Sequence, residues 1–357
     1  MGPADPATRD RSPLMDTAPP DRSPTLDDVA ERAGVSRSVA SRAINNVGNV
    51  SAPKRVAVQR AVRELGYVPN PSARALATNR VGAVVLAVAT DEPGIFADAF
   101  FAQVIYGISV ALEPTDFTLT LVLAGRPEGR AKLQQIVRSR RADGIMLMNL
   151  HGDDPLTRLA EQTTVPVVFG GRPLRGEPRW YVDTDNRGGA RLATEHLIEA
   201  GHRRIATITG PLSLDVAESR HRGFRDAMAV AELPATRVEH ADFSEAGGAA
   251  AMTRLLRAHP DLDAVFAASD NMAAGALRVL RAHGRAVPGD VGVVGFDDLP
   301  TAQHTDPQLT TVHQPVRALG AEMTRMLLSI LDGARPTPLI LPTRLVARGS
   351  TRTPVPG

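Results

Sequence analysis

Two arginines, Arg37 and Arg42, stand within a run of short polar side chains. The polar residues around them are Ser36, Ser38, Ser41 and Asn45. A guanidinium group can pair bidentately with O6 and N7 of guanine, whereas hydroxyl and amide groups suit the phosphate oxygens that position a protein on DNA. This combination indicates recognition of duplex DNA with a guanine-containing half-site. The alternative interpretation is that both arginines are ordinary exposed charges on a helix.

Positive charge is concentrated around these residues. Between Arg32 and Arg80 there are nine basic residues and one acidic residue, Glu64, although the whole chain carries a net charge of only +2. A small basic part on a mildly acidic body is typical of a modular nucleic-acid-binding protein. The same charges would also fit a solvated helical surface.

Three short helices are predicted within residues 25–66 to hold these side chains. Thr25 and Asp28 have the spacing of a capping box, and an apolar helical face follows them. Gly34 permits the sharp turn that ends the first helix.

The second of these helices carries the candidate DNA contacts. Ser36 is expected to cap it, which places Arg37 in the first turn and Arg42 one turn later. Ser51 is expected to cap the third helix, which stops at Gly66. This order predicts a helix-turn-helix, in which the start of the second helix enters the major groove.

The segments on either side differ in character. Residues 1–24 are rich in proline and poor in apolar residues, so they are predicted to be disordered, and Met15 is an alternative start. We assign residues 25–69 to the DNA-binding headpiece and residues 70–79 to a hinge helix capped by Asn70. A helix of about two turns is too short to be stable alone in water.

From Val81 onward, apolar strands alternate with amphipathic helices, which predicts parallel sheets covered by helices on both faces. The predicted strands are 83–89, 118–123, 144–148, 165–169, 204–209, 264–267 and 292–294. Residues 80–351 fit two such α/β lobes better than one, followed by a tail at 352–357. Ligands of such sheets bind at the carboxyl ends of the strands.

Several classes of function find no support in the sequence. The chain has no cysteine, which excludes disulfides, thiolate metal sites and cysteine nucleophiles. It has no apolar segment long enough to span a membrane and no apolar core of a secretory signal, so we expect a cytoplasmic, nucleoid-associated protein. A zinc-protease helix, a nucleophile elbow and a glycine-rich phosphate loop are also missing. We therefore expect neither an enzyme nor a bound metal or cofactor.

The order of motifs along the chain resembles the lactose-repressor (LacI/GalR-type) family. The resemblance covers residues 25–351. It rests on the run from Thr25 to Asn45, Leu65–Asn70, Ala73–Ala77, Val182–Asn186, Gly201–Ile205, Arg220–Phe224, Gly295–Asp298, Leu309–Val312 and Leu345–Thr351. It implies a DNA-binding transcription regulator, most simply a repressor, whose two-lobed body resembles periplasmic binding proteins.

This resemblance implies three further DNA contacts, at Tyr67, Ala73 and Leu76. The leucine that matches Leu76 wedges into the minor groove at the operator centre, one from each subunit, and bends the duplex. Packing of Leu76 against its own domain is the alternative.

The resemblance also places an effector site between the lobes. The matching positions are Phe100, Phe101, Arg220, Phe243, Ser269 and Asp297. Arg220 and Asp297 suit a polar ligand, and the phenylalanines provide apolar faces, which fits a sugar or a planar base; family membership favours a carbohydrate. Ser269 departs from the common asparagine or aspartate, so the neighbouring Asp270 is a second candidate.

A homodimer on a palindromic operator is expected, because only six residues follow Thr351 and no leucine heptads are present for a tetramer. A nucleobase-responsive or activator-type member of the same family is an alternative. A periplasmic-type solute-binding protein is a second alternative, against which the basic headpiece and the lack of a signal peptide argue. The sequence leaves open the effector, the operator and whether the effector induces or corepresses.

Overall fold

The computed structural model describes residues 23–45, 48–68, 80–90, 98–176 and 178–353. These residues form two compact units, one within residues 1–81 and the other within 82–357. The expectations for residues 1–22 and for the hinge helix, with Ala73 and Leu76, lie outside the described residues. In the described ranges, no helix is long and apolar enough to cross a membrane.

The first unit contains three helices, α1 (Leu26–Arg32), α2 (Arg37–Ile44) and α3 (Ala52–Leu65). They surround a small core formed by Val29, Ala30, Ala40, Ala43, Val58 and Ala61. The capping box is present, since the Thr25 side chain accepts from the Asp28 amide and the Asp28 carboxylate accepts from the Thr25 amide. Gly34 and Gly66 both have a positive φ, as the predicted turns require.

Two details of the predicted caps were wrong. Ser36 and Ser51 occupy the N-cap positions of α2 and α3, but neither side chain makes a capping hydrogen bond. The Ser36 hydroxyl instead lies 3.1 Å from that of Ser38. The amide groups at the start of α2 are therefore not satisfied by the cap side chain.

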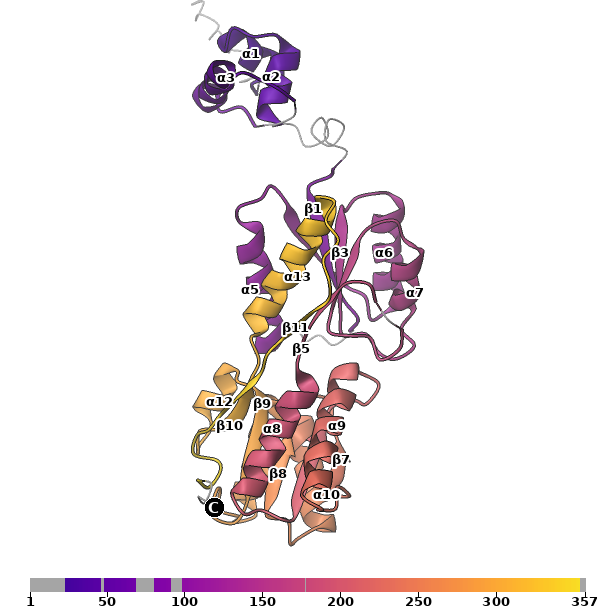
Figure 1. Ribbon diagram of the computed structural model, residues 1–357, viewed down its shortest axis with the longest axis vertical. Coiled ribbons are helices and arrows are strands. Elements are labelled where there is room, and N and C mark those ends of the chain that lie inside the picture. The colour runs from indigo at the N-terminus through magenta and orange to yellow at the C-terminus, as the bar shows by residue number, and fades with distance from the viewer. Residues whose placement is uncertain (1–22, 46–47, 69–79, 91–97, 177, 354–357) are drawn as a thin grey trace, which may run out of the picture. The chain divides into compact units, whose positions relative to one another are not determined.

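The first lobe of the second unit is built on a six-stranded sheet with the order β11-β5-β4-β3-β1-β2. Its strands are β1 (Ala83–Val88), β2 (Thr118–Leu123), β3 (Gly144–Met148), β4 (Val167–Gly170), β5 (Tyr181–Thr184) and β11 (Leu339–Leu341). Helices α5 (Ala99–Leu112) and α13 (Val316–Leu331) cover one face, and α6 (Pro127–Arg138) and α7 (Pro155–Gln162) cover the other (Figure 1). Both faces are apolar because both are covered.

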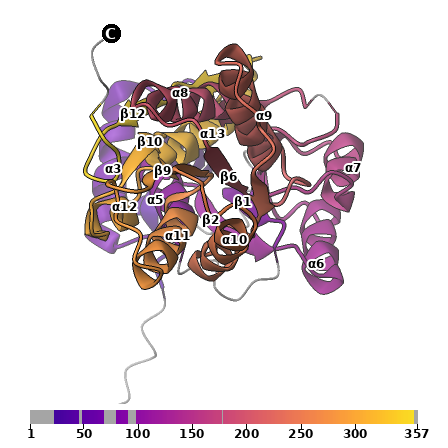
Figure 2. The same ribbon diagram turned by 90° about the horizontal axis from the view of Figure 1, so that it is seen from below.

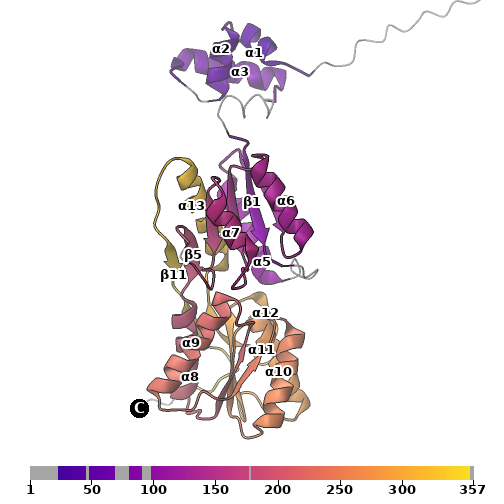
Figure 3. The same cartoon turned by 90° about the vertical axis from the view of Figure 1, so that its right-hand side faces the viewer.

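The second lobe contains another six-stranded sheet with the order β12-β10-β9-β8-β6-β7. Its strands are β6 (Ile205–Thr209), β7 (Val238–His240), β8 (Ala264–Ala267), β9 (Gly292–Asp297), β10 (Thr310–His313) and β12 (Arg344–Val346). Helices α8 (Asn186–Glu199) and α9 (Asp215–Val230) lie on one face, with α10 (Glu245–Ala258) and α11 (Asp270–Ala282) on the other (Figures 2 and 3). A short helix, α12 (Pro300–His304), follows β9.

The predicted parallel arrangement is confirmed except at one edge, where β12 pairs with β10 in the antiparallel direction. Each of the seven predicted strands is present, but β9 continues three residues further than expected and ends at Asp297. The five strands that the pattern missed, β5, β7, β10, β11 and β12, are only three or four residues long, and all of them except β11 contain polar residues. Such segments give little periodic signal.

The chain crosses between the two lobes three times. The crossings connect β5 to α8, β10 to α13, and β11 to β12. At the first lobe, the returning α13 packs so closely on α5 that a Cβ on Gly320 would lie 2.2 Å from the Val104 carbonyl oxygen. Glycine is therefore required where these helices cross.

Candidate functional site: a DNA-reading helix and an effector cavity

The candidate DNA-binding residues of the first unit lie on the outer side of α2. Ala40 and Ala43 are buried in the core, whereas Ser36, Arg37, Ser38 and Arg42 are exposed. The remaining predicted contacts in the described range, Ser41, Asn45 and Tyr67, are half-buried. The helix thus presents two guanidinium groups and several hydroxyl groups to a partner.

Contacts within α2 restrain several of these side chains. The Arg42 Nε donates to the Ser38 carbonyl oxygen at 3.2 Å, and the Asn45 amide donates to the Ser41 hydroxyl at 3.4 Å. Arg37 lies 3.5 Å from the Asp27 carboxylate, with both side chains well exposed. An exposed pair of this kind is weak, so Arg37 is free to exchange it for a phosphate or a base.

All six predicted effector residues line one cavity of the second unit. This cavity of about 490 Å³ is bordered by Phe100, Phe101, Arg220, Phe243, Ser269 and Asp297. A neighbouring cavity of about 640 Å³ shares Phe100, Phe101 and Arg220 with it and extends along the ends of β3, β4 and β5. The lining comes from the carboxyl ends of strands in both lobes, where ligands of open α/β sheets bind.

Arg220 on α9 is the most extensively bonded residue of this cavity. Its side chain is only 3% exposed. It donates to the Asn186 side chain at 2.9 Å and to the Ala268 carbonyl oxygen at 2.6 Å, and it lies 3.2 Å from the Asp297 carboxylate. Its guanidinium also stacks 3.7 Å from the centroid of the Phe296 ring. Arg220 is therefore held in one orientation by the protein itself.

Asp297 ends β9 in an unusual conformation and an unusual electrostatic environment. Its φ of 111° and that of Asp298, 57°, both lie in the left-handed region. Burial raises the pKa of Asp297 to about 6, although the charge of Arg220 opposes this effect. The Gln314 amide donates to the same carboxylate at 2.5 Å. Asp297 can consequently exchange a proton near neutral pH.

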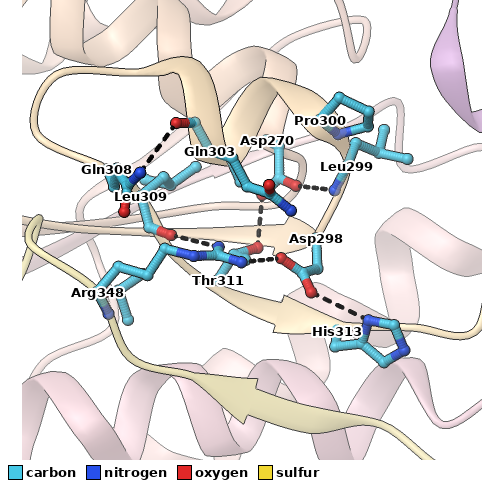
Figure 4. A network of polar contacts seen from close by, with 12 residues as sticks. Asp270, Asp298, Leu299, Pro300, Gln303, Gln308, Leu309, Thr311, His313 and Arg348 are labelled. Atoms are coloured by element: carbon cyan, nitrogen blue, oxygen red, sulfur yellow. Dashed lines mark hydrogen bonds and ion pairs between the residues drawn. The ribbon is translucent and has the colours of Figure 1, made fainter.

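The neighbouring Asp298 explains how this turn is maintained. The Arg348 guanidinium donates to one Asp298 oxygen at 2.5 Å, and His313 Nδ1 lies 3.1 Å from the other (Figure 4). Arg348 also donates to the Leu309 carbonyl oxygen at 2.9 Å. Asp298 is therefore fixed by His313 of β10 and by Arg348, which follows β12, and its fixed position orients the neighbouring Asp297, which lines the cavity.

The aromatic side chains form the apolar part of the cavity. Phe100 and Phe101 meet edge to face with their ring centroids 5.2 Å apart. Phe243, at a φ of 68°, faces Gly210, where a Cβ would lie 2.1 Å from its ring. Gly210 thus makes room for Phe243, a requirement that neither residue reveals in the sequence.

Ser269 borders the cavity and also caps a helix, whereas Asp270 has a structural role. The Ser269 hydroxyl accepts from the Met272 amide as the N-cap of α11. Asp270 is fully buried, accepts from the Thr311 hydroxyl at 2.5 Å and from the Leu299 amide at 2.8 Å, and does not line the cavity. Asn271 lines it instead. The proposal of Asp270 as the polar cavity residue was therefore wrong.

The larger cavity contains a second polar group, Asp183, which was not predicted from the sequence. Asp183 accepts from the Arg172 Nε at 3.1 Å and from the Thr184 amide at 2.8 Å, and burial raises its pKa. Burial also raises the pKa of Asp215, which lines the same cavity. One indication of this group was present in the sequence, because Asp183 lies within the Val182–Asn186 motif on which the family resemblance partly rests.

Among the described residues, several direct contacts connect the lobes near this cavity. The Thr184 hydroxyl donates to the Gln314 side-chain oxygen at 2.9 Å, which joins two of the crossing segments. At another point His151 Nδ1 lies 2.7 Å from the Ser213 hydroxyl. The Gln314 side chain bonds to both Thr184 and Asp297, so it links the cavity to two of the crossing segments.

Chemically, the cavity combines fixed donors, carboxylate acceptors and aromatic faces. Within the described part of the chain, no group of three or more histidine, aspartate or glutamate side chains could hold a metal ion. This composition suits a neutral ligand that carries many hydroxyl groups and an apolar face.

Comparison with known proteins identifies the class of protein. Residues 25–70 match the family described as bacterial regulatory proteins, lacI family, and residues 194–351 match the periplasmic binding protein-like domain. The chain is 46% identical over 336 residues to the HTH-type transcriptional regulator CelR of Thermobifida fusca, which covers 92% of this chain and 98% of that protein. It belongs to the lacI family of DNA-binding transcription regulators.

Particular relatives refine this assignment. The HTH-type transcriptional regulator GalR of Escherichia coli K12 is 36% identical over 338 residues, which cover 92% of this chain and 96% of that protein. Among solved structures, a CelR–cellobiose complex matches with a TM-score of 0.73 and 44% identity, over 92% of this chain and 99% of that one. A lac repressor dimer bound to operator and the anti-inducer ONPF matches with a TM-score of 0.78 and 29% identity, over 93% and 100%.

Proposed function

We propose that this regulator is a homodimeric repressor whose DNA binding is controlled by a carbohydrate of the cellobiose class. The observation that supports it most is the cavity in which Arg220 and Asp297 face Phe100, Phe101 and Phe243. Paired donors and acceptors suit sugar hydroxyl groups, and aromatic rings suit the apolar faces of pyranose rings. The relative CelR is known in complex with cellobiose, and the adjoining cavity provides space for a second sugar ring.

In this proposal the headpiece at 25–69 reads a palindromic operator through Arg37, Ser38 and Arg42, while Ser36, Ser41, Asn45 and Tyr67 bind phosphates. Residues 70–79 form the hinge, with Ala73 and Leu76 in the minor groove. Leu76→Ala is expected to weaken operator binding sharply and to leave cellobiose binding unchanged.

A second copy of this chain is the proposed partner. Tyr106 and Val110 on α5 are 57% and 40% exposed, and Arg317 on α13 stacks on the Tyr106 ring at 5.1 Å. An exposed apolar stripe beside an arginine fits a dimer interface. Sedimentation that gave a stable tetramer or a monomer would contradict this part.

The effector is proposed to act by changing the arrangement of the two lobes. Asp297, Gln314 and Thr184 connect the cavity to two crossing segments. To turn DNA binding largely off, the effector must favour the non-binding arrangement by several kcal/mol. We expect this regulator to act in the cytoplasm, bound to DNA of the nucleoid.

The experiment is a mobility-shift assay on the DNA upstream of the gene, combined with calorimetry. Cellobiose is expected to bind and to release the DNA, with galactose, ribose and hypoxanthine as comparison ligands. A ligand at one hundred times its Kd would stabilise the protein by about 2.7 kcal/mol. Binding of hypoxanthine and not of cellobiose would mean that the effector is a nucleobase and not a sugar. Binding of neither would refute the proposed effector class.

A further inference from the structure

Three arginines at the end of α6 have no role in the site described above. Arg138, Arg140 and Arg141 lie within four residues of one another, and all three are exposed. Within the ranges that the structure describes, none of their guanidinium groups has a hydrogen-bond or ion-pair partner. Exposed arginines of the second lobe are often paired, as Arg187 is with Asp226 and Arg254 with Glu239. The α6 cluster is therefore a concentrated and uncompensated positive charge.

The backbone at the end of α6 would be more stable with glycine in place of Arg140. The Arg141 amide donates to the Ile136 carbonyl oxygen and the Arg140 amide to that of Val137, which is the Schellman arrangement at a helix end. Arg140 occupies its left-handed position with a φ of 49°, where glycine is favoured. Arg138 alone suffices to complement the dipole of α6. Helix stability therefore does not explain the other two arginines.

The cluster lies at the point where the chain arrives from the DNA-binding unit. Because α6 connects parallel strands, its last residue lies at the edge where those strands begin. At this edge the Asp143 carboxylate accepts from the amides of Gly82, at 2.6 Å, and Ala83, at 3.1 Å. Gly82 directly follows Val81, the last residue of the first unit. Arg141 is thus two residues from Asp143, whose carboxylate holds the chain where it enters the second unit.

We propose that Arg138, Arg140 and Arg141 form a second DNA contact, which binds phosphates of the same duplex that α2 reads. This inference rests on the DNA-binding part of the proposed function. A guanidinium is suited to a phosphate because its planar fork of donors matches two oxygens. Fourteen peptide units at most separate Val68 from Gly82, and such a segment spans at most roughly 50 Å. The tether therefore keeps the cluster at high local concentration near bound DNA.

The test compares two triple variants with the same loss of charge. One carries Arg138→Gln, Arg140→Gln and Arg141→Gln. The control replaces three exposed arginines of the second lobe that line neither of the two cavities of the site, Arg225→Gln, Arg257→Gln and Arg344→Gln. Binding to the upstream DNA and to an unrelated duplex of equal length is measured by fluorescence anisotropy between about 50 and 300 mM salt.

The cluster variant is expected to weaken binding to both duplexes by a similar factor, at least about tenfold at the lowest salt. Each phosphate contact that is lost should lower the slope of log affinity against log salt by about 0.9. The control should keep the wild-type slope. A slope for the cluster variant that equals that of the control would overturn the proposal.

A single substitution separates a DNA contact from a structural role. Arg140→Gly relieves the left-handed arginine, so it should raise the melting temperature slightly while it lowers the salt slope by up to about 2 in the dimer. An increase in stability with an unchanged slope would mean that Arg140 does not contact DNA. If cellobiose does not release the DNA, the proposed effector is refuted, but the arginine contact with DNA is not affected. Failure of the proposed effector and failure of the proposed DNA contact can therefore be distinguished.

Discussion

Removal of Arg220 should be costly, and its cost should depend on pH. Arg220→Met keeps much of the side-chain volume but removes the charged partner of the Asp297 carboxylate, which keeps its bond from Gln314, and removes the donor to the Asn186 oxygen and the Ala268 carbonyl oxygen. Removal of one partner of a buried ion pair typically costs about 3–5 kcal/mol, because a charge remains unpaired. We expect a loss of this size in the free energy of unfolding at pH 8.

The same loss should be smaller at pH 5. The pKa of Asp297 is about 6 with Arg220 present, and the arginine lowers it, so the pKa rises further in the variant. A carboxyl group whose folded-state pKa is raised holds its proton more tightly when folded, so stability falls as the pH rises through this range. The loss at pH 8 should therefore exceed the loss at pH 5. The difference is about 1.4 kcal/mol for each unit by which the pKa of Asp297 in the folded variant exceeds its pKa in the folded wild type.

Urea unfolding followed by circular dichroism at both pH values measures these quantities. Arg222→Met is the matched control, since Arg222 lies on the same helix but is 53% exposed and forms an exposed ion pair with Glu218. Its loss should cost less than about 1 kcal/mol. The double variant Arg220→Met/Asp297→Asn should recover part of the stability at pH 8. A cost for Arg220→Met that is equal at both pH values would refute the electrostatic account.

Three other substitutions test the packing and the electrostatics. Between pH 4 and 6 the wild type should lose stability relative to Asp297→Asn as the pH rises, because the pKa of Asp297 in the folded protein is about 6 and exceeds the ordinary 3.8. The full difference in the free energy of unfolding is about 3 kcal/mol. Urea titrations of the two proteins that differ by the same amount at every pH would argue against it. Gly320→Ala should cost at least about 2 kcal/mol, since its Cβ meets the Val104 carbonyl oxygen, whereas Ser109→Ala on the exposed side of α5 should change the melting point little. Thr25→Ala removes the capping box and should cost about 1 kcal/mol, visible as faster amide exchange in α1; unchanged exchange would mean that the cap contributes nothing.

Local features of the fold were predictable from the sequence because their causes are local. The Thr25–Asp28 capping box, the turn at Gly34 and the seven apolar strands depend on residues a few positions apart. The candidate site was only partly predictable. Its six effector residues came from a family resemblance, but their arrangement depends on contacts between distant segments, such as Gln314 with Asp297 and Gly210 with Phe243.

The errors have the same physical origin. Asp270 and Ser269 are adjacent polar residues after a strand, and nothing local tells which of them faces a cavity. The answer depends on the Thr311 hydroxyl and the Leu299 amide, which donate hydrogen bonds to Asp270 from about 30 to 40 positions away along the chain. Asp183 was missed because its strand, β5, has four residues and only a weak apolar pattern.

The three crossings between the lobes affect how this protein can be made. No continuous stretch of the gene encodes the first lobe, because α13 and β11 follow the whole of the second sheet except β12. Val316, Leu319, Met323 and Leu327 of α13 are buried in the core beneath α5. During synthesis, the first lobe must therefore wait with this apolar face uncovered until more than 300 residues have left the ribosome. Every strand of the second sheet except β12 can assemble before the first sheet is closed, so completion of the first lobe is tied to the last part of translation.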